Sequence, residues 1–126
     1  MKPSTEKLVQ CLFIDDEEWK HWMLSRNLEK LAVSMKHVRT SGQAIDALQA
    51  YPFDIVFLDM ILFPNRPLRD SSNGMAIVDR IVEMETPPSL VVLTAVDPIP
   101  NAWAKAALDE AKVAWTRIPF QLVRPH

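Results

Sequence analysis

The sequence predicts an α/β fold, in which helices cover a doubly wound parallel sheet of five strands. Three observations carry this prediction. Short apolar runs recur along the chain, segments with a helical period separate them, and 126 residues suffice for one domain with a sizeable core. Strands and helices that alternate in this way favour a parallel sheet with right-handed crossovers.

The five predicted strands differ in polarity, and this difference predicts their places in the sheet. Residues 8–14, 55–58 and 90–93 are nearly continuous apolar runs. Such runs are typical of parallel strands that are covered on both faces, so these three are expected at the centre of the sheet. Residues 35–39 and 113–118 mix apolar and polar side chains, so these two strands are expected at the edges.

Four helices are predicted between the strands, because apolar residues recur there with the period of a helix. Their apolar stripes are Leu24, Leu28 and Leu31; Ala44, Ile45 and Leu48; Ile77, Val78, Ile81 and Val82; and Ala104, Ala107, Leu108 and Ala111. Asn101 is expected to cap the fourth helix, behind Pro98 and Pro100, because an asparagine side chain accepts hydrogen bonds at helix starts.

Composition argues against several classes of function. The 14 basic and 16 acidic residues give a formal net charge of −2, so a basic surface for nucleic acid is not expected. Cys11 is the only cysteine, which rules out an intrachain disulfide and favours a reducing, cytoplasmic compartment. The apolar runs are too short to span a membrane. Ten prolines against two glycines exclude the glycine-rich loops that bind phosphate in many nucleotide-binding proteins.

Polar side chains follow three predicted strands at the points where these strands end. Asp15 and Asp16 follow the first apolar run, Asp59 follows the second, and Thr94 follows the third. If these strands are neighbours, the carboxylates converge at the sheet edge where ligands bind in such folds. Close carboxylates repel one another, and Mg²⁺, which takes carboxylate and water oxygens, removes the conflict. The alternative is that Asp16 only caps the next helix and Asp59 is a solvated loop residue.

Five segments of the chain together resemble a known family. They are residues 13–17 (FIDDE), 40–48 (TSGQAIDAL), 53–60 (FDIVFLDM), 92–95 (VLTA) and 118–120 (IPF). In this order and spacing they resemble the motifs of the response-regulator receiver domain (CheY-like). The resemblance covers residues 8–120 of a single domain that spans 1–126. It implies a flavodoxin-like sheet with the strand order 2-1-3-4-5, and signalling rather than catalysis, apart from self-phosphorylation and autodephosphorylation.

The resemblance also implies a role for the residues at the sheet edge. Asp59 would accept a phosphoryl group from a histidine kinase, a phosphotransfer protein or a small phosphodonor. Thr94 would bind the phosphoryl oxygens, and Trp115 stands at an aromatic position whose rotation is coupled to Thr94. Mg²⁺ would be held by Asp15, Asp16, Asp59 and the backbone carbonyl of Ile61. Phosphoryl transfer requires such parts: an in-line nucleophile, a metal and positive charge on the phosphoryl oxygens.

Two departures from the family pattern lie close to this predicted site. Ile118 stands where the family has a lysine that neutralises the phosphoryl oxygens. The neighbouring Arg117 is expected to point to the opposite face of its strand, because side chains alternate along a strand. The loop 63–73 is long, polar and rich in proline. It is either a tolerated surface insertion, a lid or partner-recognition segment, or the source of a replacement cation through Arg66 or Arg69.

A third departure concerns the last helix of the family. Few residues follow Pro119, so this helix is expected to be absent or truncated. Its absence would leave part of one sheet face uncovered, and an exposed apolar patch of that size usually marks an interface. A homodimer, a partner helix or a longer parent chain would each account for the uncovered face.

Two other functions stay open from the sequence. A pseudo-receiver would bind partners without depending on phosphate, and Ile118 and the missing last helix favour it. An enzyme of the haloacid-dehalogenase type also forms an aspartyl phosphate, but it requires an Asp-x-Asp motif, whereas Asp15 is followed directly by Asp16. The sequence therefore favours a signalling receiver that keeps its magnesium and aspartate site and has altered switching.

Overall fold

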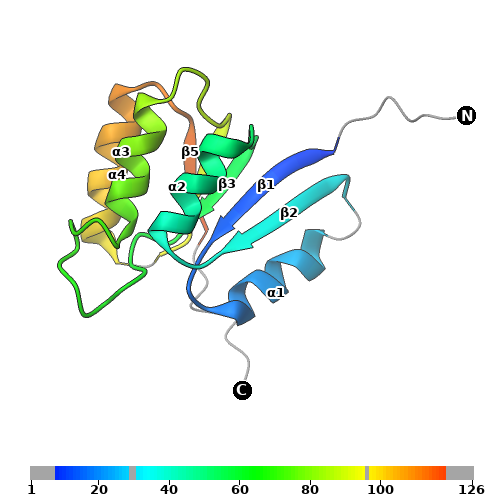
Figure 1. Ribbon diagram of the computed structural model, residues 1–126, viewed down its shortest axis with the longest axis horizontal. Helices are drawn as coiled ribbons and strands as arrows, with labels where there is room; N and C mark the ends of the chain where they lie inside the picture. The colour runs from blue at the N-terminus through cyan, green and yellow to red at the C-terminus, as the bar shows by residue number, and fades with distance from the viewer. Residues whose placement is uncertain (1–7, 29–30, 96, 119–126) are drawn as a thin grey trace, which may run out of the picture.

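Five parallel strands form one sheet in the order β2-β1-β3-β4-β5 (Figure 1). The computed structural model describes residues 8–28, 31–95 and 97–118, with the backbone only for residues 19 and 21–24. The strands are β1 (Val9–Ile14), β2 (Val33–Val38), β3 (Ile55–Leu58), β4 (Leu90–Leu93) and β5 (Trp115–Arg117). The predicted strand order is confirmed, and so are the edge positions of β2 and β5.

Four helices alternate with these strands and lie on both faces of the sheet. They are α1 (Glu18–Leu28), α2 (Ser41–Ala50), α3 (Gly74–Glu83) and α4 (Pro98–Glu110). Figure 1 shows α2, α3 and α4 on one side of the sheet and α1 on the other. This is the doubly wound arrangement that the alternating sequence pattern predicts.

The two sides of the sheet carry separate apolar clusters. Leu12 and Ile14 of β1 belong to the larger cluster, which packs against α2, α3 and α4. Cys11 and Phe13 belong to a smaller cluster, against which Leu28 of α1 packs. Successive side chains of a strand point to opposite faces, so a continuously apolar strand serves both clusters.

The start of α4 differs from the prediction. Asp97 is the N-cap, and its carboxylate accepts a hydrogen bond from the N–H of Ile99 at 3.0 Å. Pro98 occupies the first helical position, where the fixed φ of proline suits a helix and its missing N–H has no partner to lose. Asn101 lies inside the helix, buried, and its Nδ2 donates to the carbonyl of Ala95 at 2.9 Å. The prediction that Asn101 caps this helix is therefore wrong.

Two of the predicted apolar stripes extend beyond the helices that the structure shows. Helix α1 ends at Leu28, and Leu31 is 58% exposed in the segment before β2. Ala111 is the exposed C-cap of α4. Lys112 follows with a φ of 61°, a left-handed conformation that turns the chain out of the helix. The assignment of Leu31 and Ala111 to buried stripes is therefore wrong.

Two central residues of the sheet are buried on the α1 side. Phe57 and Val92 belong to the smaller cluster and are 6% and 3% exposed. The expectation of an uncovered sheet face depends on the absence of the last helix, so it stays a prediction. The described residues end at Ile118, so Pro119, Phe120 and the expected absence of the last helix lie outside them.

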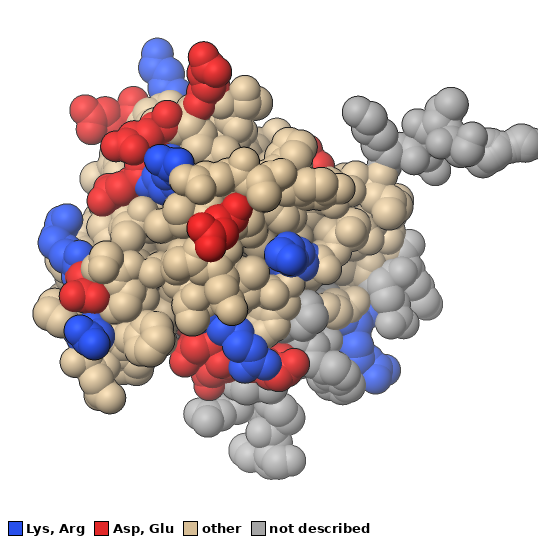
Figure 2. All heavy atoms as spheres, viewed as in Figure 1, with Lys and Arg blue, Asp and Glu red and all other residues tan. Residues whose placement is uncertain are grey.

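Two surface properties bear on the class of partner. On the face shown in Figure 2, acidic and basic side chains of the described residues are interspersed, and they form no continuous basic patch there. Among the helices within 8–28, 31–95 and 97–118, none is long and apolar enough to cross a membrane.

Candidate functional site

The register of the sheet brings three predicted residues to one edge. Ile14, Leu58 and Leu93 are the last residues of β1, β3 and β4, and they lie side by side in the sheet. Asp15, Asp59 and Thr94 follow them directly. The N–H of Asp59 donates to the carbonyl of Ile14, and the N–H of Thr94 donates to the carbonyl of Leu58, each at 3.0 Å. These backbone bonds hold the two aspartates and the threonine at the carboxyl edge of the central strands.

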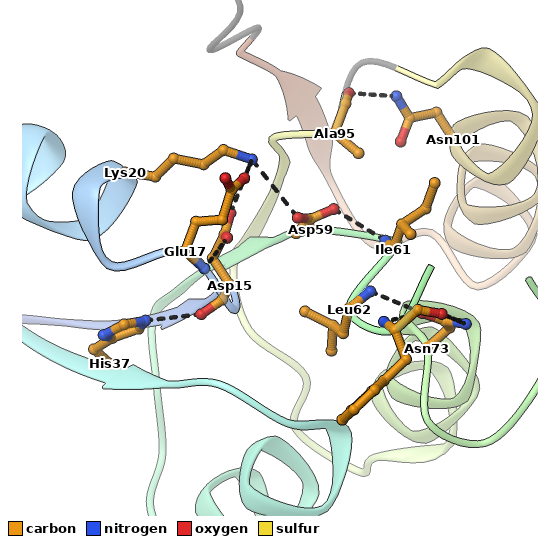
Figure 3. A network of polar contacts seen from close by, with 11 residues as sticks. Asp15, Glu17, Lys20, His37, Asp59, Ile61, Leu62, Asn73, Ala95 and Asn101 are labelled. Atoms are coloured by element: carbon orange, nitrogen blue, oxygen red, sulfur yellow. Dashed lines mark hydrogen bonds and ion pairs between the residues drawn. The ribbon is translucent and has the colours of Figure 1, made fainter. Parts of the chain in front are cut away.

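Both aspartates are buried, and their surroundings disfavour two full charges. Oδ1 of Asp15 accepts the N–H of Glu17 at 2.8 Å, and Oδ1 of Asp59 accepts the N–H of Ile61 at 2.9 Å (Figure 3). Burial raises the pKa of Asp15. Burial, reinforced by the charge of Asp15, raises the pKa of Asp59 from 3.8 to about 7. The charge of Lys20 lowers this pKa only in part, and a bound divalent cation would favour the ionised form of Asp59 further.

Lys20 is the residue at this site that the sequence analysis missed. Its Nζ lies 3.1 Å from Oε1 of Glu17, 3.4 Å from Oδ2 of Asp15 and 3.7 Å from Oδ2 of Asp59 (Figure 3). Burial alone would lower the pKa of Lys20, but the charges of Asp59 and Asp15 outweigh it, so the pKa is raised. One signal was available: Lys20 stands three residues after Glu17 in the first turns of α1, a spacing that pairs opposite charges.

The acidic cluster is defined here as Asp15, Asp16, Glu17 and Asp59. Asp15, Asp16 and Glu17 offer carboxylate oxygens that lie within 4.8 Å of one another. Hard oxygen donors of this kind suit Mg²⁺, and within the described chain Oδ2 of the buried Asp15 has an ion pair with Lys20 but no hydrogen bond. Glu17 was not among the predicted ligands. The residues present therefore fit a divalent cation.

Thr94 contributes a buried hydroxyl to the same edge. Its side chain is 1% exposed, and its Oγ1 has no hydrogen-bond partner among the described residues. An unpaired buried hydroxyl is unfavourable, so such groups usually serve a ligand or a bound water. A ligand oxygen at this edge of the sheet would satisfy it.

Trp115 and Arg117 face α4 from the edge strand. Together with residues of α4 they line a hollow of about 160 Å³. The Nε1 of Trp115 donates to Oδ1 of Asp109 at 2.7 Å, and the Nζ of Lys105 lies 5.9 Å from the indole ring. Ile118 alternates with Arg117 along the chain and is 39% exposed. Arg117 lies on the α4 side of β5, and its orientation opposite to Ile118 stays a prediction.

The loop 63–73 is anchored by Asn73, another residue that the sequence analysis missed. This side chain is fully buried, and its Oδ1 accepts the N–H groups of Leu62 and Phe63 at 2.7 and 2.8 Å. Its Nδ2 donates to the carbonyls of Phe63 and Pro67 at 3.2 and 2.9 Å. One side chain therefore ties both ends of the loop together (Figure 3).

The two arginines of this loop do not supply the cation beside Asp59. The guanidinium carbon of Arg69 lies 4.1 Å from the ring centroid of Trp103 in α4, and Arg66 is exposed. The option that either arginine reaches into the site is therefore wrong, because Lys20 is the cation that the structure places there.

Comparisons of the sequence found no matching protein-family model and no matching curated protein. Solved structures are similar in fold. A response regulator receiver domain protein (CheY-like) from Methanospirillum hungatei has a TM-score of 0.70 at 14% identity, over 91% of this chain and 83% of its own. A response regulator from Thermotoga maritima, in complex with Mg²⁺ and BeF, has a TM-score of 0.69 at 14% identity, over 92% and 91%.

A third similar structure contains a modified aspartate. It is a response regulator from Burkholderia pseudomallei with a phosphorylated aspartic acid and a calcium ion, with a TM-score of 0.65 at 18% identity. The likeness covers 92% of this chain and 61% of that one. Together with the strand order and the acidic residues that follow β1 and β3, these comparisons show that the chain has the CheY-like fold of response-regulator receiver domains.

Proposed function

We propose that this protein is a signal-transduction receiver that accepts a phosphoryl group on Asp59, with Mg²⁺ bound by the acidic cluster and with altered switching. The observation that carries the proposal is the pair of buried carboxylates of Asp15 and Asp59 at the sheet edge that also carries Thr94, whose hydroxyl has no hydrogen-bond partner among the described residues. A bound cation would stabilise the two carboxylates, and a phosphoryl oxygen would accept from the hydroxyl.

The proposed metal ligands are oxygens of the acidic cluster and its neighbouring loop. They are Asp15, Asp16, Asp59 and the backbone carbonyl of Ile61, and the geometry adds Glu17 as a candidate. When bound, Mg²⁺ supplies the positive charge that offsets the carboxylates and the phosphoryl oxygens. The chain's own contribution is to hold these oxygens together on the ends of β1 and β3.

In the proposed transfer, a carboxylate oxygen of Asp59 forms a bond to phosphorus while the P–N bond of a phosphohistidine donor breaks. The imidazole nitrogen leaves with the electron pair of that bond, and an acyl phosphate remains on Asp59. The donor would be a histidine kinase or a phosphotransfer protein; with acetyl phosphate, a small phosphodonor, the bond that breaks is instead a P–O bond and acetate leaves with its electron pair. The N–H of Ile61, which already bonds to Oδ1 of Asp59, orients the carboxylate for this attack.

The switching step is expected to differ from the family pattern at two points. Ile118 carries no positive charge, so it cannot draw the phosphoryl oxygens toward β5 as a lysine would. Trp115 can rotate toward Thr94 only after its 2.7 Å hydrogen bond to Asp109 breaks. Movement of Thr94 toward a phosphoryl group is therefore less strongly coupled to β5.

Beryllofluoride, a mimic of the aspartyl phosphate, tests the proposal. Addition of Mg²⁺ and beryllofluoride to the protein is expected to change its tryptophan fluorescence, because Trp115 stands at the position where rotation of an aromatic side chain is expected to be coupled to Thr94. Asp59→Asn is expected to abolish the change. Asp46→Asn, an exposed aspartate of α2, serves as the matched control and should respond like the wild type. Mass spectrometry after incubation with acetyl phosphate should show a phosphoryl group on Asp59.

A pseudo-receiver is the second candidate, and Ile118 together with the cation already present beside Asp59 favours it. In that case the chain would bind a partner protein without phosphate. No fluorescence change at millimolar Mg²⁺ with excess beryllofluoride, and no phosphorylation of Asp59, would decide for this second function.

A further inference from the structure

We infer that the Nζ of Lys20 is the resident cation of the acidic cluster: it neutralises these carboxylates when no metal is bound, and it must leave before Mg²⁺ can bind them. The inference rests on the proposed function for the identity of the metal-binding carboxylates. It adds that Lys20 and Mg²⁺ compete for the same carboxylates, and that this competition sets the affinity of the site for the metal.

The atoms that Lys20 pairs with are the atoms a metal would need. Its ammonium group lies within 4 Å of Oδ2 of Asp15 and Oδ2 of Asp59, which come from different strands, and of Oε1 of Glu17. An Mg²⁺ ion binds oxygens at about 2.1 Å and needs them arranged around itself. An ammonium group that already lies among those oxygens repels the Mg²⁺ ion and keeps the carboxylates paired with the lysine. The two cations therefore exclude each other.

The lysine is built into the site and is not a mobile surface charge. Its side chain is 13% exposed, while Asp15 is fully buried and the side chain of Asp59 is 8% exposed. Charges that are shielded from water in this way interact more strongly than exposed pairs. Other described lysines differ: Lys105 pairs with Asp109 at 3.6 Å, and both of those side chains are more than half exposed.

Removal of the lysine charge tests the inference directly. Isothermal titration with MgCl₂ is expected to show that Lys20→Gln binds Mg²⁺ about tenfold or more tightly than the wild type, because one competing charge is gone. Lys20→Arg keeps the charge and should stay close to the wild type. Lys105→Gln is the matched control and should not change the affinity. Equal or weaker Mg²⁺ binding by Lys20→Gln, or no binding by any variant, would overturn the inference.

A second measurement uses the wild-type sequence, so it tests the inference even if Lys20→Gln fails to fold. Acetylation of lysines with acetic anhydride, followed by mass spectrometry, reports how accessible each Nζ is. Labelling of Lys20 is expected to rise several-fold in saturating Mg²⁺, as the metal displaces it from the carboxylates, while labelling of Lys105 stays constant. Unchanged labelling of Lys20 would refute the displacement.

These outcomes separate the inference from the proposed function. Tighter Mg²⁺ binding by Lys20→Gln without any reaction of Asp59 with beryllofluoride would support the competition and argue against the receiver function. Reaction of Asp59 with beryllofluoride, with no effect of Lys20→Gln on Mg²⁺ affinity, would support the receiver function and reject the competition.

Discussion

Replacement of Asp59 by asparagine is expected to change how the stability of the protein depends on pH. Asparagine has nearly the shape of the neutral aspartic acid, and its side-chain oxygen can accept the N–H of Ile61 as Oδ1 of Asp59 does. The substitution removes the titration of the carboxyl and leaves the buried position filled. An effect of the amide that does not depend on pH shifts the free energy of unfolding equally at every pH. The comparison between wild type and Asp59→Asn therefore uses only how that free energy changes with pH.

The magnitude follows from the burial of Asp59, which is 5% exposed and little screened by solvent. Its pKa rises from 3.8 to about 7, chiefly through burial and then through Asp15. At about 1.4 kcal/mol for each unit of pKa, this rise corresponds to roughly 4 kcal/mol. The folded protein binds the proton more tightly than the unfolded chain does. The free energy of unfolding of the wild type is therefore expected to fall by up to that amount, relative to that of Asp59→Asn, as the pH rises from about 4 to about 7.

Urea unfolding, followed by circular dichroism in the presence of EDTA, measures the two free energies of unfolding at several pH values. The difference between the free energies of unfolding of wild type and Asp59→Asn should change with a slope approaching 1.4 kcal/mol per pH unit between about pH 4 and 7. Above about pH 7 this difference should level off. Mg²⁺ should restore wild-type stability at higher pH and have a smaller effect on the variant. Parallel pH profiles for the two proteins would refute the reasoning about Asp59.

Two further predictions concern the packing that supports the site. Gly74→Ala would place a Cβ 2.6 Å from the Cα of Met60 and is expected to cost about 1–3 kcal/mol of stability in urea unfolding. Gly42→Ala meets no atom within 4 Å and should be neutral or stabilising by up to about 1 kcal/mol; equal losses for both glycines would contradict the close approach. Asn73→Ala leaves buried N–H groups unpaired and is expected to cost about 3 kcal/mol and to hasten proteolysis in the loop 63–73. Asn65→Ala, exposed in the same loop, is its control, and a similar stability for both would argue against the anchoring role.

The sequence correctly predicted which residues meet at one edge of the sheet where the neighbourhood of strands alone decides position. Asp15, Asp59 and Thr94 follow directly after central parallel strands, and parallel strands that are neighbours end at the same edge. It could not decide between the alternatives for Arg66 and Arg69, which stand near Asp59 in the sequence. Distance along a loop does not determine where a long side chain points, and Arg69 instead lies over Trp103 of a helix that is remote in the sequence.

The sequence by itself determined the class of fold, the central and edge strands and the positions of the carboxylates, because apolar periodicity and strand ends are local properties of the chain, while the strand order came from the resemblance to receiver domains. Tertiary structure decided which cation faces Asp59, because that depends on the rotation of α1 against the sheet and brings Lys20 to carboxylates on two strands. It also decided that Asn73 closes the long loop. Contacts of this kind join segments that no local pattern relates, so they became visible only when the helices and loops were placed on the sheet.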